Sequence, residues 1–65
     1  MLENNSRISE FFSDDQNRTA SIVMHDGLLK VIFVDRISNI NAFKYYKSSN
    51  SAEAAAENFV MYESY

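Results

Sequence analysis

The only glycine of the sequence, Gly27, follows Asp26 between two apolar runs, and this arrangement constrains the fold most strongly. Aspartate–glycine pairs are typical of two-residue hairpin turns, because glycine readily adopts the positive φ that these turns require. Over residues 19–25, every second residue from Ala20 to Met24 is apolar, and residues 28–35 are apolar at nearly every position. Successive side chains of a strand point to opposite faces, so both runs suit strands. The sequence therefore predicts an antiparallel hairpin at its centre.

The second run is apolar on both of its expected faces. One face carries Leu29, Val31 and Phe33, and the other carries Leu28, Lys30, Ile32 and Val34. Strands that are buried on both faces have near-continuous apolar sequences of this kind. We therefore expect this strand to be central in a sheet that is covered on both sides, by helices or by another subunit.

A third strand and a helix are predicted after the hairpin. Residues 36–41 have the asparagine and serine content of a turn, and residues 42–47 alternate as a strand that extends the hairpin into a meander. Asn50, with Glu53 three residues later, resembles a capping box. The alanine-rich sequence that follows predicts a helix over residues 51–62, with a buried stripe of Ala52, Ala55, Ala56 and Phe59.

The N-terminal segment, residues 1–18, is polar except for Ile8, Phe11 and Phe12. Their i, i+3, i+4 spacing is that of one face of a helix, so we expect a short helix that docks on the sheet. The chain contains no proline and no linker-like segment, which indicates a single domain. The predicted fold class is α+β: a short N-terminal helix, a three-stranded antiparallel β-meander over residues 19–47, and a C-terminal helix packed on the sheet.

The size of the chain predicts self-association. Folds of about 65 residues usually need disulfides, a metal or oligomerisation to be stable. The sequence has no cysteine and a single histidine, so oligomerisation is the ordinary route that remains. Its nine aromatic residues, four Tyr and five Phe, are difficult to bury in one small monomer. We expect a homodimer, with candidate interface residues Phe11, Phe12, Phe59, Met61, Tyr62 and Tyr65.

No catalytic or metal-binding constellation is visible in the sequence. His25 beside Asp26 could act as a general base, but no nucleophile neighbours it, and a hydrogen-bonding role at the hairpin turn is favoured. The acidic residues Asp14 and Asp15, and Glu53 and Glu57, lack the spacing and the glycine of a cation-binding loop. We therefore expect a protein that is not an enzyme and that holds no cofactor and no metal.

One short stretch suggests an alternative function. Lys44, Tyr45, Tyr46 and Lys47 interleave basic and aromatic residues, and such residues on a sheet can stack single-stranded bases and contact phosphates. The net charge of −3 opposes this interpretation, because dedicated nucleic-acid binders usually have a basic surface. Single-stranded nucleic-acid binding is thus an alternative to the protein-interaction module that we expect.

The sequence also gives an expectation for the cellular compartment of the protein. The first residues have neither the positive nor the apolar region of a targeting segment, and the longest apolar run, Val31–Val34, is far shorter than the ~20 residues of a membrane span. We expect no membrane association and a cytoplasmic protein.

The order of motifs over residues 20–62 is also informative. A short hairpin, then a strand with lysines and tyrosines, then an alanine-rich segment from Ser51 to Phe59 that ends in Glu-Asn-Phe, resembles small uncharacterised proteins of tailed bacteriophages, marine ones included. The resemblance implies a phage-encoded accessory protein in the host cytoplasm, and it assigns no catalytic residue. An inhibitor that docks on a host protein by its acidic surface is a further alternative.

Overall fold

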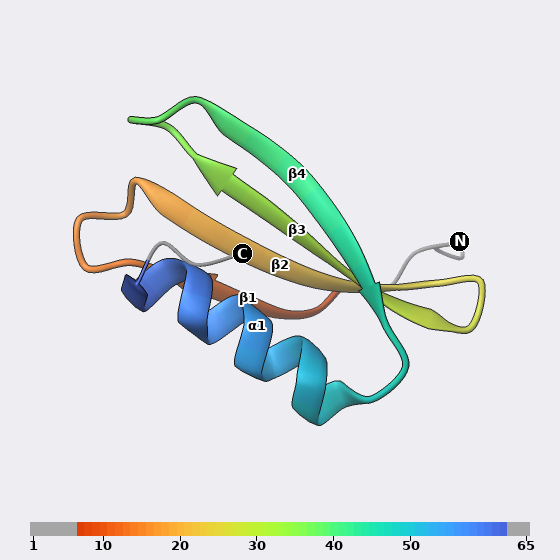
Figure 1. The fold of residues 1–65 in the computed structure, drawn as a ribbon. Coiled ribbons are helices and arrows are strands. Elements are labelled where there is room, and N and C mark those ends of the chain that lie inside the picture. Colours follow the sequence, from red (N-terminus) through yellow and green to blue (C-terminus); the bar gives the residue numbers. More distant parts are fainter. Residues whose placement is uncertain (1–6, 63–65) are drawn as a thin grey trace.

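The computed structural model describes residues 7–62 and shows a four-stranded antiparallel sheet with one helix packed on one of its faces (Figure 1). The strands are β1 (Arg7–Phe12), β2 (Arg18–His25), β3 (Leu28–Asp35) and β4 (Ile40–Tyr46), and the helix is α1 (Ser49–Tyr62). The strands lie in chain order, β1-β2-β3-β4, so the sheet is a meander. Within residues 7–62, no helix combines the length and the apolarity that crossing a membrane requires.

The predicted central hairpin is confirmed. β2 and β3 pair without interruption from Arg18↔Asp35 to His25↔Leu28. Asp26 and Gly27 both have positive φ, 52° and 79°, as in the type I′ turns that match the twist of the flanking strands. Aspartate tolerates this conformation and glycine adopts it without steric cost, so the local sequence is sufficient to specify the turn.

The N-terminal segment is a strand, and the helix predicted from the spacing of Ile8, Phe11 and Phe12 is wrong. β1 pairs antiparallel with β2, with a register shift between Arg7 and Ser9. An isolated helix of two turns is marginal in water, whereas strand pairing satisfies the backbone groups along the otherwise free edge of β2. The sheet therefore has four strands, not the three predicted.

The loops and the last strand follow the sequence closely. The predicted third strand is β4, which starts at Ile40 and ends at Tyr46. In the turn before it, the buried Asp35 accepts hydrogen bonds at Oδ1 from the backbone N–H groups of Ile37 (3.0 Å) and Ser38 (3.1 Å). Aspartate side chains commonly fix turns in this way. The carboxylate of Asp35 thus holds the β3–β4 connection.

The helix α1 is capped by Ser48, not by the predicted Asn50. The backbone N–H of Ser51 donates a hydrogen bond to Ser48 Oγ at 3.1 Å, and Asn50 lies inside the first turn. Serine at this position satisfies one of the first helical N–H groups, which have no partner within the helix. The helix accordingly begins two residues earlier than residue 51.

The core lies between α1 and one face of the sheet. The helix buries Ala52, Ala56, Phe59 and Val60, and Ala55 packs beside them, which confirms the predicted stripe and adds Val60. From the sheet come Ala20, Ile22, Leu29, Val31 and Phe33. The rings of Phe33 and Phe59 meet edge-on with their centroids 5.0 Å apart, a favourable arrangement for buried aromatic side chains. Alanines in the first half of α1 allow the helix to approach the sheet closely.

Candidate functional site

The face of the sheet that points away from α1 is not covered by any other described element (Figure 1). Side chains alternate along each strand, so this side carries the residues that lie between the core residues of β2, β3 and β4. Its apolar members, which we call the open face, are Val23, Leu28, Ile32, Val34, Phe43 and Tyr45. The first four are half-buried by their neighbours, and Phe43 and Tyr45 are exposed.

The strand register makes the open face continuous. Ile32 of β3 lies opposite Phe43 of β4, and the next residue of this side of β3, Val34, lies beside Ile32 along the strand. Tyr45 follows Phe43 along β4 and lies opposite Lys30. Directly opposite residues have Cβ atoms about 5 Å apart. The apolar groups therefore form one patch and are not scattered singly over the surface.

The aromatic side chains of the open face interact with Lys30. The Lys30 ammonium lies 4.5 Å from the centroid of the Phe43 ring and 5.9 Å from that of Tyr45. The two rings meet edge-on at 5.6 Å, and the His25 ring lies 6.0 Å from the Tyr45 ring. A cation over a ring face is attracted by the negative charge of the π-system. Lys30 thus covers part of the Phe43 ring, although 55% of Phe43 is still exposed.

The six predicted interface residues fall in different places. Phe59 is fully buried in the core of its own chain, and Phe11 packs against this core but is only half-buried. Phe12 is exposed at the end of β1, and Met61 and Tyr62 are exposed in the last turn of α1. Tyr65 lies outside the described residues. Met61 and Tyr62, on the helix, are therefore separate from the open face.

The four residues of the basic and aromatic stretch are divided between the two sides of the sheet. Tyr45 belongs to the open face, whereas Tyr46 packs partly against the core on the side of α1. Lys44 lies on the same side as Tyr46, and Lys47 is exposed just after β4. The two tyrosine rings point in opposite directions. They therefore do not form a single platform on which successive bases could stack.

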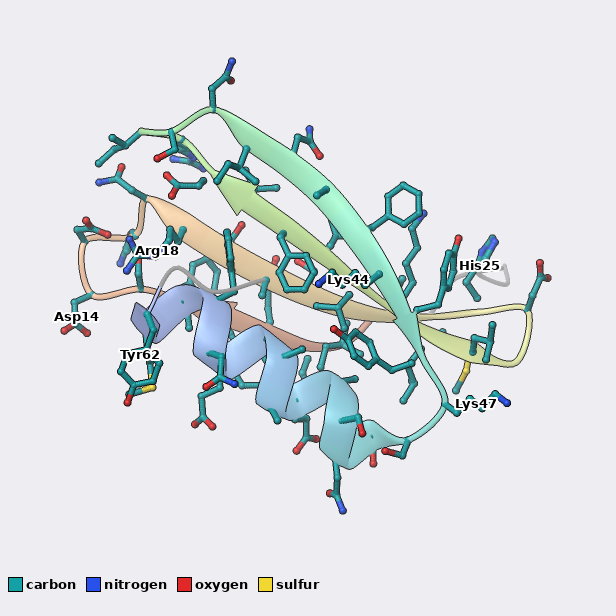
Figure 2. All side chains as sticks on the ribbon, viewed as in Figure 1. Asp14, Arg18, His25, Lys44, Lys47 and Tyr62 are labelled. Atoms are coloured by element: carbon teal, nitrogen blue, oxygen red, sulfur yellow. The ribbon has the colours of Figure 1, made fainter. Side chains whose placement is uncertain are left out.

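A hollow of about 320 Å³ lies near the end of the sheet opposite His25 and Lys47, where Figure 2 labels Asp14, Arg18 and Tyr62. It is lined by Phe12, Ser13, Asp14, Asp15, Arg18, Val60 and Met61. The Arg18 guanidinium donates hydrogen bonds to the Val60 carbonyl oxygen through Nε (3.3 Å) and Nη2 (2.9 Å). This carbonyl is among the last of α1, which have no partner within the helix. Arg18 therefore ties β2 to the end of α1.

The carboxylate of Asp15, which lines this hollow, is engaged within its own loop. Asp15 Oδ1 accepts hydrogen bonds from Ser13 Oγ (2.7 Å) and from the Asn17 backbone N–H (3.1 Å). These bonds, with the Ser13 bond the larger effect, lower the pKa of Asp15 to about 2, because they stabilise the charged form. The geometry is that of a loop held together internally. It gives no indication of a ligand for this carboxylate.

The described residues offer no metal centre. They contain no group of three or more histidine, cysteine, aspartate or glutamate side chains placed to hold an ion. His25, the last residue of β2, has its Nε2 atom 3.5 Å from Asp26 Oδ2 of the exposed hairpin turn. Asp35, buried at the β3–β4 turn, has no hydrogen-bond partner for Oδ2 among the described residues, but its other oxygen fixes the turn.

The open face was not among the surfaces predicted from the sequence, although a signal for it was present. The two-sided apolar pattern of β3 predicted a sheet covered on both sides, by helices or by another subunit. Of the two predicted helices, the described residues contain only α1, which covers one side. The consequence is that Ile32, Val34 and Phe43, on the side without a helix, have no helix over them among the described residues. To identify the uncovered side from the sequence, one would need to know on which face of the sheet the helix packs.

No family model matches the chain, and no significantly similar protein was found among curated proteins or solved structures.

Proposed function

We propose that the protein is a non-catalytic protein-interaction module that self-associates, and that the open face is the contact between two copies. One observation carries the proposal: α1 covers one side of the sheet (Figure 1), and the other side presents six apolar residues grouped around Lys30, with polar residues such as Ser21 and Asn41 between them. A sheet that is apolar on both sides is normally packed on both sides.

The hydrophobic effect favours covering this patch. Removing apolar surface from water stabilises the covered state by about 25 cal/mol per Å². The six residues of the open face include two exposed rings and four half-buried aliphatic side chains. A domain of 65 residues gains little surplus stability from a one-sided core. Burial of the second side adds a second apolar layer, and oligomerisation is a usual way in which small folds become stable.

The dimensions of the sheet suit a second copy. Four strands about 4.8 Å apart, each about 25 Å long, present a face of roughly 450–500 Å², so two copies together remove roughly 1,000 Å². Specific contacts start near this area. In a twofold dimer the same patch serves both subunits, and sheets commonly stack face to face about 10 Å apart. The result is a sandwich with a helix on each outer side.

The charges around the open face are compatible with self-association. Lys30 and Glu10 lie on the same side of the sheet, and Ser21, also on this side, donates a hydrogen bond to Glu10 Oε2 at 3.4 Å. Two copies related by a twofold axis can therefore bring opposite charges together. A face with charges of one sign would repel its own copy.

Sedimentation velocity of two charge variants tests the proposal. Phe43→Glu places a charge on the open face, and Met61→Glu places one on the last turn of α1, at a residue with nearly the same exposure, 57% against 55%. We expect Phe43→Glu to weaken the dimer by at least about tenfold, because the desolvation of a buried carboxylate costs more than about 1.4 kcal/mol even with Lys30 beside it. Met61→Glu should leave the dimer intact.

The opposite pattern contradicts the proposal. Dissociation by Met61→Glu with an intact Phe43→Glu dimer would move the contact to the end of α1, where Tyr62 is also exposed. Circular dichroism and thermal melting of both variants in dilute solution show whether each one is still folded. A second variant of the open face, Ile32→Lys, repeats the test at the centre of the patch.

A further inference from the structure

We infer that the free edge of β4 accepts an extended acidic segment of another protein as a fifth strand. β4 is the last strand in the order β1-β2-β3-β4, so only one of its edges is paired. The backbone N–H and C=O groups that point away from β3 are available for a further strand. This inference concerns the edge of the sheet and is independent of the self-association of its open face.

The edge of β4 has no bulge and no proline. Its seven residues pair with β3 in unbroken register from Ile40↔Asp35 to Tyr46↔Leu29, and the strand contains no proline. The opposite edge strand, β1, is shorter and has a register shift between Arg7 and Ser9. Bulges, short strands, proline and charged side chains, lysine above all, are the common means by which proteins prevent strand addition. Of these β4 has only Lys44, whose charge opposes a basic strand but attracts an acidic one. β4 is thus the edge that is open to pairing.

β4 is also poorly covered. None of its residues is buried: Ile40, Ala42 and Tyr46 are half-buried, and the others are exposed. In Figure 1, β4 lies at the edge of the sheet beyond β3, with its outer side unobstructed. A partner strand would therefore reach its backbone without displacement of another described element.

The positive charge beside the edge of β4 favours an acidic partner strand. All three lysines of the chain, Lys30, Lys44 and Lys47, lie on β4, directly after it, or opposite it on β3, and residues 40–48 include no acidic residue. The chain as a whole has a net charge of −3, so this edge is an exception. Carboxylates of an added strand would lie beside Lys44 and Lys47, both of which are exposed. Opposite charges on neighbouring strands stabilise a pair.

The same charge disfavours a second copy at this edge. An antiparallel pair of two β4 strands, centred near Phe43, would place Lys44 of both copies on one side as diagonal neighbours about 7 Å apart or closer. Like charges at such distances are destabilising. The added strand is therefore a segment of different composition. Strand addition with side-chain selectivity is an established mode of peptide recognition.

Fluorescence anisotropy with a labelled peptide tests the inference. The probe alternates glutamate and valine over about eight residues, which is within the usual range of strand lengths, and its matched control has lysine in place of glutamate. We expect the full chain to bind the acidic probe at least about tenfold more tightly than the lysine probe, and less tightly as salt increases. Equal binding of both probes would overturn the inference.

Two further comparisons separate strand addition from charge attraction alone. Methylation of alternate peptide nitrogens of the acidic probe, on the side that faces β4, should abolish binding, because it removes the donors of a ladder. Lys44→Glu should weaken binding by at least about fivefold, whereas Arg36→Glu, the same change at an exposed residue of the β3–β4 turn, should change it by less than about twofold. The inference is contradicted if the methylated probe binds as tightly as the acidic probe. It is also contradicted if Lys44→Glu and Arg36→Glu weaken binding equally.

Anisotropy measurements with a single-stranded oligonucleotide and with a variant of the open face distinguish failure of this inference from failure of the proposed dimer. A single-stranded oligonucleotide that binds more tightly than the acidic probe would assign the lysines to nucleic acid and overturn the inference. Ile32→Asn, which disrupts the proposed dimer contact from β3 without adding a charge beside β4, should still bind the acidic probe within about twofold of the unchanged protein. Absence of probe binding by the unchanged protein, with an intact dimer, refutes strand addition alone and leaves the proposed self-association standing.

Discussion

The ammonium of Lys30 lies 4.5 Å from the centroid of the Phe43 ring, on the side of the sheet that α1 does not cover. The two residues belong to adjacent strands, and this contact joins the only basic residue of that side of β3 to the exposed phenylalanine of β4. At exposed sites such a contact is worth about 0.5–1 kcal/mol.

A double-mutant cycle measures this contact. Lys30→Met retains most of the aliphatic stem and removes the charge, and Phe43→Leu removes the ring. We expect a coupling free energy of about 0.5–1 kcal/mol from urea unfolding of the four proteins in dilute solution. A coupling of zero would show that Lys30 is held at this position by the strand and not by the ring.

The buried ring pair predicts the largest single loss of stability. Phe59 is fully buried and meets Phe33 at 5.0 Å, so Phe59→Ala should lower the free energy of unfolding by about 3–5 kcal/mol. That loss is comparable to the total stability of a 65-residue domain, about 3–10 kcal/mol. The control is Tyr62→Ala, three residues later and 68% exposed, which should change stability by less than about 0.5 kcal/mol. Equal losses in thermal or urea unfolding would contradict the assignment of the core.

The capping of α1 by Ser48 predicts that alanine substitutions at Ser48 and at Asn50 change the stability of the fold differently. Ser48→Ala removes the oxygen that accepts the Ser51 N–H bond and should lower stability by about 1 kcal/mol. Asn50→Ala, inside the first turn, should be neutral or slightly stabilising, because alanine is the better helix former. Urea unfolding of both variants decides between the two caps. The reverse order would restore Asn50 as the cap.

The lowered pKa of Asp15 predicts a contribution to stability that depends on pH. The pKa is about 2 in the folded chain and 3.8 for a free side chain. The carboxylate therefore stabilises the fold above pH 3.8, and this contribution is lost as the pH falls from 3.8 to about 2. Carbon NMR of the carboxyl group should give a midpoint near 2, which Ser13→Ala should raise, since the Ser13 bond is the largest cause. An unchanged midpoint in this variant would contradict the role of Ser13.

Local signals specified the central hairpin and the helix. The turn at Asp26 and Gly27 needs only the conformational preferences of those two residues and the alternation beside them. The stripe that ends at Phe59 follows from the period of the helix. These parts of the fold were predictable because the information lies within a few residues of each turn or stripe.

The N-terminal strand could not be predicted in the same way. The spacing of Phe11 and Phe12 suits a helix, and only the pairing with β2 reverses this preference. That pairing is a tertiary effect: the free edge of β2 supplies hydrogen-bond partners that a short isolated helix lacks. The open face was missed for a related reason, since which side of the sheet α1 covers depends on the whole topology.

Sedimentation equilibrium of the unchanged protein, from micromolar to millimolar concentration, tests the central claim most directly. The monomer has a mass of 7.5 kDa. If the open face is the contact between two copies, the apparent mass should rise with concentration to twice 7.5 kDa, which is 15 kDa, and stop there. A mass of 7.5 kDa at every concentration would contradict the claim that this face is covered by a second copy.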